Sequence, residues 1–196
     1  KERKYEEAYE VCHRVYEMDK NFVFNNSLYA WSIYRKDLTG ENLPDFETFI
    51  EQAHLITSIT NQSESQSPYT KTVFRVLDYL DRQPEYDADM MLEWLDKVDY
   101  KKLPKEVDMY TNRTGKKISP ASFYEQYFTY KAKVLYKKEL YQESIDLCKE
   151  AFETVPKFHN NNDIWLLRRV ALANARLGKT DLALEQLNDI LEENNR

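Results

Sequence analysis

The sequence predicts an all-α protein, and three observations support this fold class. Apolar residues recur at spacings of three and four along most of the chain, which places them on one face of a helix. No segment shows convincingly the alternation of apolar and polar residues that is typical of a half-buried strand. The 196 residues include only three glycines, Gly40, Gly115 and Gly178. Phosphate-binding loops and tight β-hairpins need several glycines, so nucleotide-binding α/β folds and β-barrels are nearly excluded.

The apolar periodicity predicts nine helices. Their ranges are 5–16, 22–37, 46–59, 69–80, 90–98, 123–138, 141–155, 164–177 and 181–191. Gly40 and Pro44 break the pattern between the second and third helices, and the polar stretch NQSESQSP ends the third. Pro84 closes the fourth helix. The periodicity then stops between Pro104 and Pro120, which predicts a long insert.

Three segments of the chain align with one another without gaps. They are RKYEEAYEVCHRV, ELYQESIDLCKEA and GKTDLALEQLNDI. In each, a turn leads into a helix whose small residue is Ala8, Ser144 or Ala183. A small residue there lets the partner helix of the same hairpin approach closely. An internal repeat of helical hairpins is therefore predicted.

The C-terminal part of the chain resembles the tetratricopeptide repeat family. The family's pattern of about 34 residues falls on Phe128, Lys131, Ala132, Leu135, Ser144, Cys148, Ala151 and Pro156. Lys131 stands where the family usually has an apolar residue, and Leu135 stands where it usually has Tyr. The corresponding residues of the next repeat are Leu167, Val170, Ala171, Asn174, Gly178, Ala183, Leu187 and Ile190. The match is best over 125–193 and fair over 1–36, and it implies a right-handed α-solenoid of stacked antiparallel helical hairpins.

We expect residues 1–196 to form a single helical domain that is a piece of a longer chain. Within it, 1–100 would hold irregular N-terminal hairpins, 101–120 a basic insert loop, and 121–196 two better-formed hairpins. The run FHNNNDIWLLRRVALANARLG also resembles bacterial repeat proteins that accompany nucleic-acid enzymes in mobile-element or defence loci.

Composition and charge narrow the function classes. The net charge is −6, which opposes generic binding to polyanions. The chain has no apolar run long enough to cross a membrane and begins without a signal-peptide pattern, so we expect a cytoplasmic protein.

Cys12 and Cys148 are far apart and occupy interior positions of the repeat, which favours core packing over nucleophilic catalysis. The three histidines, at 13, 54 and 159, lack metal-ligand spacing, so they are expected at the surface. We therefore expect no enzyme, cofactor or metal.

The resemblance implies that the first helix of each hairpin lines a concave peptide-binding groove. By helical spacing the groove residues are Gln126, Thr129, Lys133, Tyr136, Lys137, Trp165, Arg168, Leu172 and Arg176, with Arg169 beside them. An acidic peptide would complement this side, because Arg168 and Arg176 donate charge-assisted hydrogen bonds and Trp165 supplies an apolar anchor. The alternative is an ordinary solvated helix face.

A second basic feature is the insert. Its basic residues are Lys101, Lys102, Lys105, Arg113, Lys116 and Lys117. They could contact phosphates or a partner, or belong to a solvated linker. We thus carry two hypotheses: a protein-interaction scaffold that uses the groove, and a nucleic-acid-associated accessory module of a larger bacterial defence or mobile-element protein.

Overall fold

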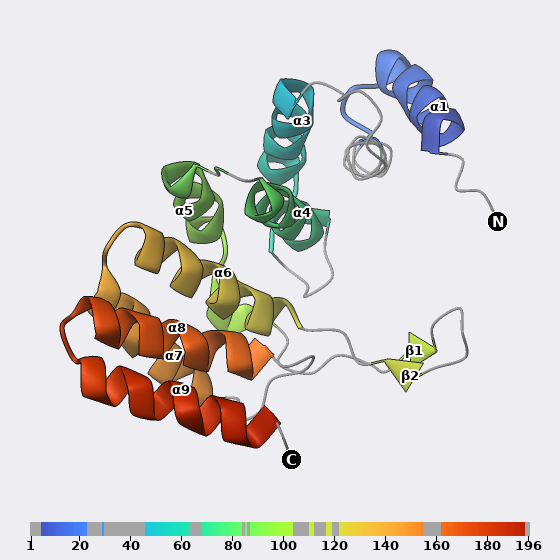
Figure 1. Ribbon diagram of the computed structural model, residues 1–196. Coiled ribbons are helices and arrows are strands. Elements are labelled where there is room, and N and C mark those ends of the chain that lie inside the picture. Colours follow the sequence, from blue (N-terminus) through green and yellow to red (C-terminus); the bar gives the residue numbers. More distant parts are fainter. Residues whose placement is uncertain are drawn as a thin grey trace. The chain divides into compact units, whose positions relative to one another are not determined.

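The computed structural model confirms an all-α fold (Figure 1). It describes residues 5–22, 29, 46–62, 68–83, 85, 87–103, 110–111, 117–118, 122–154 and 162–194. Within these residues the α-helices are α1 (Tyr5–Met18), α3 (Phe46–Ile59), α4 (Pro68–Arg82), α5 (Ala88–Asp96), α6 (Phe123–Lys137), α7 (Tyr141–Thr154), α8 (Asn162–Arg176) and α9 (Thr180–Asn194). The predicted helix over 22–37 lies outside the described residues except at positions 22 and 29.

Two short features in the insert region were not predicted. A 3₁₀ turn, η1 (Tyr100–Lys102), follows α5. Strands β1 (Tyr110–Thr111) and β2 (Lys117–Ile118) pair antiparallel, with Tyr110 opposite Ile118. Each strand has two residues, which is too short to produce a recognisable alternation of polar and apolar residues.

The chain forms two compact units. Unit 1 comprises residues 1–86 and 96–99, and unit 2 comprises 87–95 and 100–196. In unit 1, α3 packs against α4 through residues that are almost wholly buried: Phe49, Ala53, Ile56, Val73, Val76, Leu77 and Leu80. The Phe49 and Tyr79 rings pack with their centroids 5.5 Å apart. This interface is the core of unit 1 within the described residues.

The segment that follows α5 is held to unit 1 by hydrogen bonds to its backbone. The Gln62 side chain donates from Nε2 to the carbonyl oxygen of Asp99 over 2.9 Å and accepts from the Asp99 amide over 2.8 Å. The Tyr69 hydroxyl donates to the carbonyl oxygen of Lys97 over 2.7 Å. Two side chains of unit 1 thus satisfy three backbone groups of the 96–99 segment.

Unit 2 contains the repeated hairpins. The pairs α6–α7 and α8–α9 are antiparallel hairpins, and α6 and α8 lie next to each other (Figure 1). Ser144 is fully buried in α7, and its hydroxyl donates to the carbonyl oxygen of Ala132 in α6 over 2.9 Å. Ala171 and Ala183 are the equivalent buried pair 39 residues later. Small residues at this level allow the two helices of each hairpin to approach closely, as the repeat pattern predicts.

Both hairpin turns close in the same way. The amide of Leu140 bonds to the carbonyl of Leu135, and the amide of Lys179 bonds to that of Asn174. This closure requires one residue with positive φ between the helices. Gly178 takes that conformation in the second hairpin with φ 79°, whereas in the first the residue is Glu139 with φ 61°. Glu139 therefore adopts a left-handed backbone conformation that favours glycine.

These two turns should respond oppositely to substitution. Glu139→Gly removes the left-handed penalty at an exposed site, and we expect it to raise the free energy of unfolding by about 0.5–1 kcal/mol. Gly178→Ala should lower it by about 1 kcal/mol. A Cβ at Gly178 meets no atom within 4 Å, so this loss would come from the backbone alone. Urea unfolding of both variants measures the effects, and shifts of the same sign would contradict the assignment of the turns.

An aromatic cluster joins η1 to the first hairpin of unit 2. The Tyr100 ring stacks on Tyr127 with centroids 5.2 Å apart and meets Phe128 edge-on at 5.4 Å. Its hydroxyl donates a hydrogen bond to the Glu150 carboxylate of α7. That bond, together with burial, raises the pKa of Tyr100 to about 12. Tyr100 therefore links η1 to both helices of the hairpin.

Tyr100→Phe isolates the hydroxyl, because the ring contacts remain. A raised folded pKa gives stability that is complete below the ordinary tyrosine pKa of about 10. That stability falls as pH rises to about 12. We expect the wild type to be more stable than Tyr100→Phe at pH 8 and this difference to shrink between pH 10 and 12. Denaturant titrations of the two proteins across this range provide the measurement, and a constant difference would contradict the hydrogen bond.

Candidate functional site

The predicted groove residues lie on α6 and α8, the neighbouring first helices of the two hairpins. We call this surface the α6–α8 face; it consists of Gln126, Thr129, Lys133, Tyr136, Lys137, Trp165, Arg168, Arg169, Leu172 and Arg176. None of these ten side chains is buried. The residues on α6 and those on α8 belong to successive repeats, 39 residues apart in the sequence. Stacking of the two hairpins brings these helices together.

Tyr136 is the centre of the contacts between the two helices on this face. The guanidinium carbon of Arg169 lies 4.6 Å from the centroid of the Tyr136 ring, within cation–π range. Arg176 donates from Nε to the Tyr136 hydroxyl over 3.4 Å, and this bond raises the pKa of Arg176 above its ordinary value. One tyrosine of α6 therefore contacts two arginines of α8.

A second pair lies nearer the start of α8. Trp165 is 57% exposed, which is unusual for the largest apolar side chain. The guanidinium carbon of Arg168 lies 5.8 Å from the Trp165 ring centroid. Leu172 is half-buried one turn after Arg168. This part of α8 thus presents an apolar ring beside a cation.

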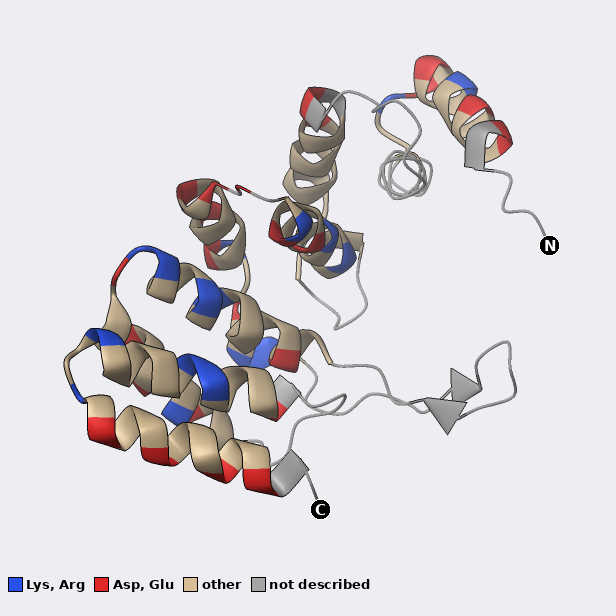
Figure 2. Ribbon diagram, in the orientation of Figure 1, with Lys and Arg blue, Asp and Glu red and all other residues tan. Residues whose placement is uncertain are grey.

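The remaining residues of the face belong to α6. Thr129 directs its hydroxyl to the carbonyl oxygen of Glu125, 2.9 Å away, which satisfies that hydroxyl within its own helix. Gln126 and Lys133 are half-buried, and Lys137 is exposed at the end of the helix. Lys133, Lys137, Arg168, Arg169 and Arg176 make the face basic in a protein of net charge −6 (Figure 2).

The basic insert is described only in part. Lys101 and Lys102 lie exposed on η1, and Lys117 begins β2. Lys105, Arg113 and Lys116 lie outside the described residues. The insert residues therefore remain a predicted contact surface.

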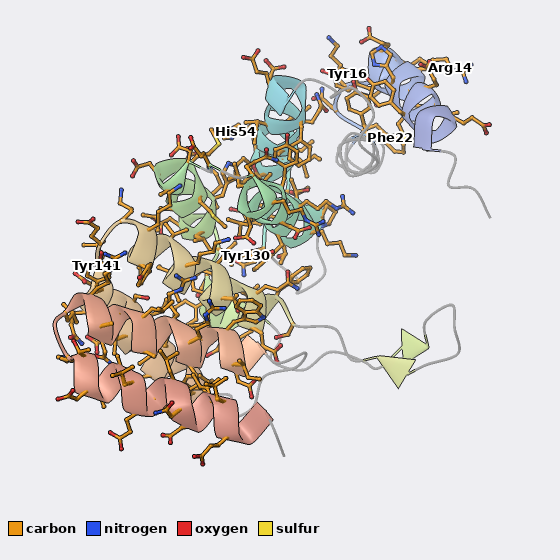
Figure 3. All side chains as sticks on the ribbon, in the orientation of Figure 1. Arg14, Tyr16, Phe22, His54, Tyr130 and Tyr141 are labelled. Carbon is orange, nitrogen blue, oxygen red and sulfur yellow. The ribbon has the colours of Figure 1, made fainter. Side chains whose placement is uncertain are left out.

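Two aromatic arrangements were missed by the sequence reasoning. Tyr141, which is labelled in Figure 3, lies at the start of α7. Its ring meets the Tyr136 ring edge-on, with the centroids 5.2 Å apart. In unit 1 the nearly buried Tyr29 stacks on Tyr16 at 5.3 Å and contacts the Nδ1 atom of His13 at 3.3 Å. His13 was expected at the surface but is half-buried in this stack, because Tyr9 also packs parallel to it at 5.9 Å. Helical spacing alone does not reveal a partner 16 residues away.

Cys12 and Cys148 are buried free thiols, as predicted. Burial raises the pKa of Cys148 to about 12, although Arg169 acts in the opposite direction. No group of three His, Cys, Asp or Glu side chains in the described part could hold a metal ion. None of the described helices is long and apolar enough to cross a membrane.

The fold belongs to the class of helical-repeat structures, built from stacked hairpins. Within that class it is TPR-like. A crystal structure of nearly identical TPR-like repeats from a putative kinesin light chain of Podosopora anserina has a TM-score of 0.60 to this chain at 13% identity, and the alignment covers 98% of this chain and 90% of that one. A variant form of the same repeats has a TM-score of 0.61 at 12% identity, with 96% of this chain and 86% of that one covered. No family model and no curated protein matches the sequence.

The Cys148 thiol should be inert in the folded protein. It is fully buried with a raised pKa, so the reactive thiolate is scarce at pH 8. We expect iodoacetamide to modify Cys148 at least 100-fold more slowly in native protein than in protein unfolded in urea. Mass spectrometry of the tryptic peptides separates Cys148 from Cys12. Equal rates in both states would show that the thiol is accessible and reopen a nucleophilic role.

Proposed function

We propose that this chain is a non-enzymatic protein-interaction module whose α6–α8 face binds an acidic peptide. The TPR-like fold supports the general role, because stacked helical hairpins create extended surfaces that suit protein partners. The single observation that carries the site is the pair Arg169 and Arg176, which both contact Tyr136 from the neighbouring helix.

Ordering by Tyr136 lowers the entropic cost of binding. A long, free arginine loses much rotamer freedom when it meets a ligand, whereas Arg169 and Arg176 are already restrained by the tyrosine ring and hydroxyl. Guanidinium groups donate several hydrogen bonds in a plane, so each retains donors that can reach a carboxylate. The arrangement favours carboxylate ligands over neutral ones.

Trp165 and Arg168 extend the site along α8. The exposed indole offers apolar area to a partner side chain, and exposed tryptophans and arginines are enriched among residues that dominate binding energy. The proposed ligand is therefore an extended peptide with carboxylates facing Arg168, Arg169 and Arg176 and one apolar side chain facing Trp165.

Charge reversal tests this proposal. The probes are two pools of fluorescein-labelled decapeptides, one with Asp or Glu at half of its positions and one with Lys or Arg there. We expect the acidic pool to bind the full chain in fluorescence anisotropy and the basic pool not to. Arg168→Glu combined with Arg176→Glu should weaken binding by at least tenfold, because attraction becomes repulsion at two positions.

A matched control reverses two exposed lysines outside the α6–α8 face. Lys149→Glu with Lys179→Glu makes the same change in net charge and should leave the affinity within twofold of wild type. Circular dichroism should show equal helicity for all three proteins. Equal weakening in both double variants would reduce the effect to net charge and contradict the site. Binding of an oligonucleotide at low salt, without any peptide binding, would instead support the nucleic-acid-associated function.

A further inference from the structure

Two arginines of the α6–α8 face meet at a single tyrosine. Arg169 and Arg176 are seven residues apart on α8, so at 3.6 residues per turn they lie within about 20° of each other around the helix. The guanidinium carbon of Arg169 lies 4.6 Å from the centroid of the Tyr136 ring, and Nε of Arg176 lies 3.4 Å from the hydroxyl oxygen of the same tyrosine. The two guanidinium groups therefore lie beside one side chain.

The positive charge at this tyrosine is not neutralised by an ion pair. Within the described residues, neither Arg169 nor Arg176 forms an ion pair with a carboxylate. The hydrogen bond to the Tyr136 hydroxyl is the main cause of the raised pKa of Arg176, and Glu139 contributes least to it. Like charges that lie close together repel each other, and a bound anion would remove that repulsion. The pair therefore suits an anionic ligand.

Most of the hydrogen-bond donors at this place remain available to a ligand. A guanidinium group has five N–H donors, and Arg176 uses the one on Nε for the Tyr136 hydroxyl. Arg169 lies over the ring and, within the part of the chain that the structure describes, donates no side-chain hydrogen bond. The Tyr136 hydroxyl accepts from Arg176, so its own proton can still be donated. Two guanidinium groups and one hydroxyl thus offer donors in the same small region.

A phosphate monoester matches this arrangement better than a carboxylate does. It carries a charge of about −1.5 to −2 at pH 7 and three strong acceptor oxygens, whereas a carboxylate carries a single charge and two oxygens. Several carboxylates of an extended peptide are spread along its chain, but a phosphate brings its charge and its acceptors to one place. Both cations beside Tyr136 are arginines, whose planar fork bonds phosphate with two parallel N–H groups.

Trp165 adds a second determinant on the same side of α8. It lies within about 40° of Arg169 and about 20° of Arg176 around the helix. Its side chain is 57% exposed. From Trp165 to the midpoint between the two arginines the helix rises about 11 Å, at 1.5 Å per residue. An extended peptide that runs along α8 covers this distance in about three residues.

We propose that the α6–α8 face binds a phosphorylated peptide whose phosphate is held by Arg169, Arg176 and the hydroxyl of Tyr136. An apolar side chain three residues from the phosphorylated one contacts Trp165. This inference rests on the proposed function, since it specifies which acidic group the same face selects. Carboxylates of an acidic peptide use the same donors more weakly. Phosphorylation of the partner therefore controls binding, because it replaces a neutral hydroxyl with a dianion.

The probe is a fluorescein-labelled decapeptide with one phosphoserine, leucines three residues before and three residues after it, and alanine or glycine elsewhere. Three companion peptides carry phosphotyrosine, glutamate or serine in place of the phosphoserine. We expect the phosphoserine peptide to bind the full chain in fluorescence anisotropy at least tenfold more tightly than the glutamate peptide, and the serine peptide to bind more weakly still. The ³¹P resonance of the phosphoserine should shift on binding, which reports a contact at the phosphate itself.

Charge-conserving variants separate the guanidinium geometry from net charge. Arg169→Lys with Arg176→Lys keeps both charges but removes the planar forks, and it should weaken binding of the phosphoserine peptide by at least tenfold. Tyr136→Phe keeps the ring and removes the hydroxyl, which should weaken binding by about threefold. The matched control is Arg14→Lys, at an exposed arginine of α1 (Figure 3), and it should leave the affinity within twofold of wild type. Circular dichroism should show equal helicity for all of these proteins.

A double-variant cycle tests the contact at Trp165. Replacing both leucines of the phosphoserine peptide by glycine should weaken binding to the wild type by at least threefold. Trp165→Ala should remove this difference between the two peptides, because the apolar partner is then absent. An unchanged difference would contradict the three-residue spacing.

Equal affinities for the phosphoserine and glutamate peptides, or no binding of either phosphorylated peptide, would overturn this inference. If the acidic decapeptide pool still bound, the proposed function would stand without it. If no acidic or phosphorylated peptide bound, both would fail. Inorganic phosphate that competes at the same concentration as the phosphoserine peptide would show a site for free phosphate. A single-stranded oligonucleotide that competes equally well would show a nucleic-acid surface, and either result would overturn the assignment to a phosphorylated peptide.

Discussion

The structure of unit 2 depends on the close approach of two helices at one small buried residue. At Ser144 the approach is tight enough for the hydroxyl to reach the carbonyl of Ala132, and at Ala183 a methyl group fills the equivalent place. A larger side chain would separate the helices and move α6 and α8 relative to each other. The contacts of Arg169 and Arg176 with Tyr136 require α6 and α8 at their present spacing. The arrangement of the α6–α8 face therefore depends on Ser144 and Ala183, although neither residue belongs to that face.

Much of the fold could be predicted because helical periodicity is a local property. The last four predicted helices agree with α6–α9 to within three residues at either end, since turns at Glu139 and Gly178 interrupt the pattern clearly. The β1–β2 pair was missed because two residues per strand carry no period. The division into two units was also not visible in the sequence, because it depends on which helices share a core.

The sequence could predict which residues lie on the candidate site, but it could not predict which of their side chains contact one another. Spacing placed Tyr136, Arg169 and Arg176 on the same side of neighbouring helices. It could not show that one tyrosine would contact both arginines, or that Tyr141 would pack on its edge, because side-chain pairing across helices depends on their separation.

The hydrogen bonds from Gln62 and Tyr69 to residues 97 and 99 have a consequence for dissecting the protein. The chain leaves unit 1 after residue 86, returns for four residues, and leaves again after residue 99. Neither unit is a continuous stretch of sequence. A truncation at residue 86 would strip unit 1 of the backbone groups that these two side chains satisfy, and a start at residue 100 would remove α5 from unit 2. The hairpins repeat along the chain, but neither unit can be expressed as one continuous piece of the sequence without losing part of its structure.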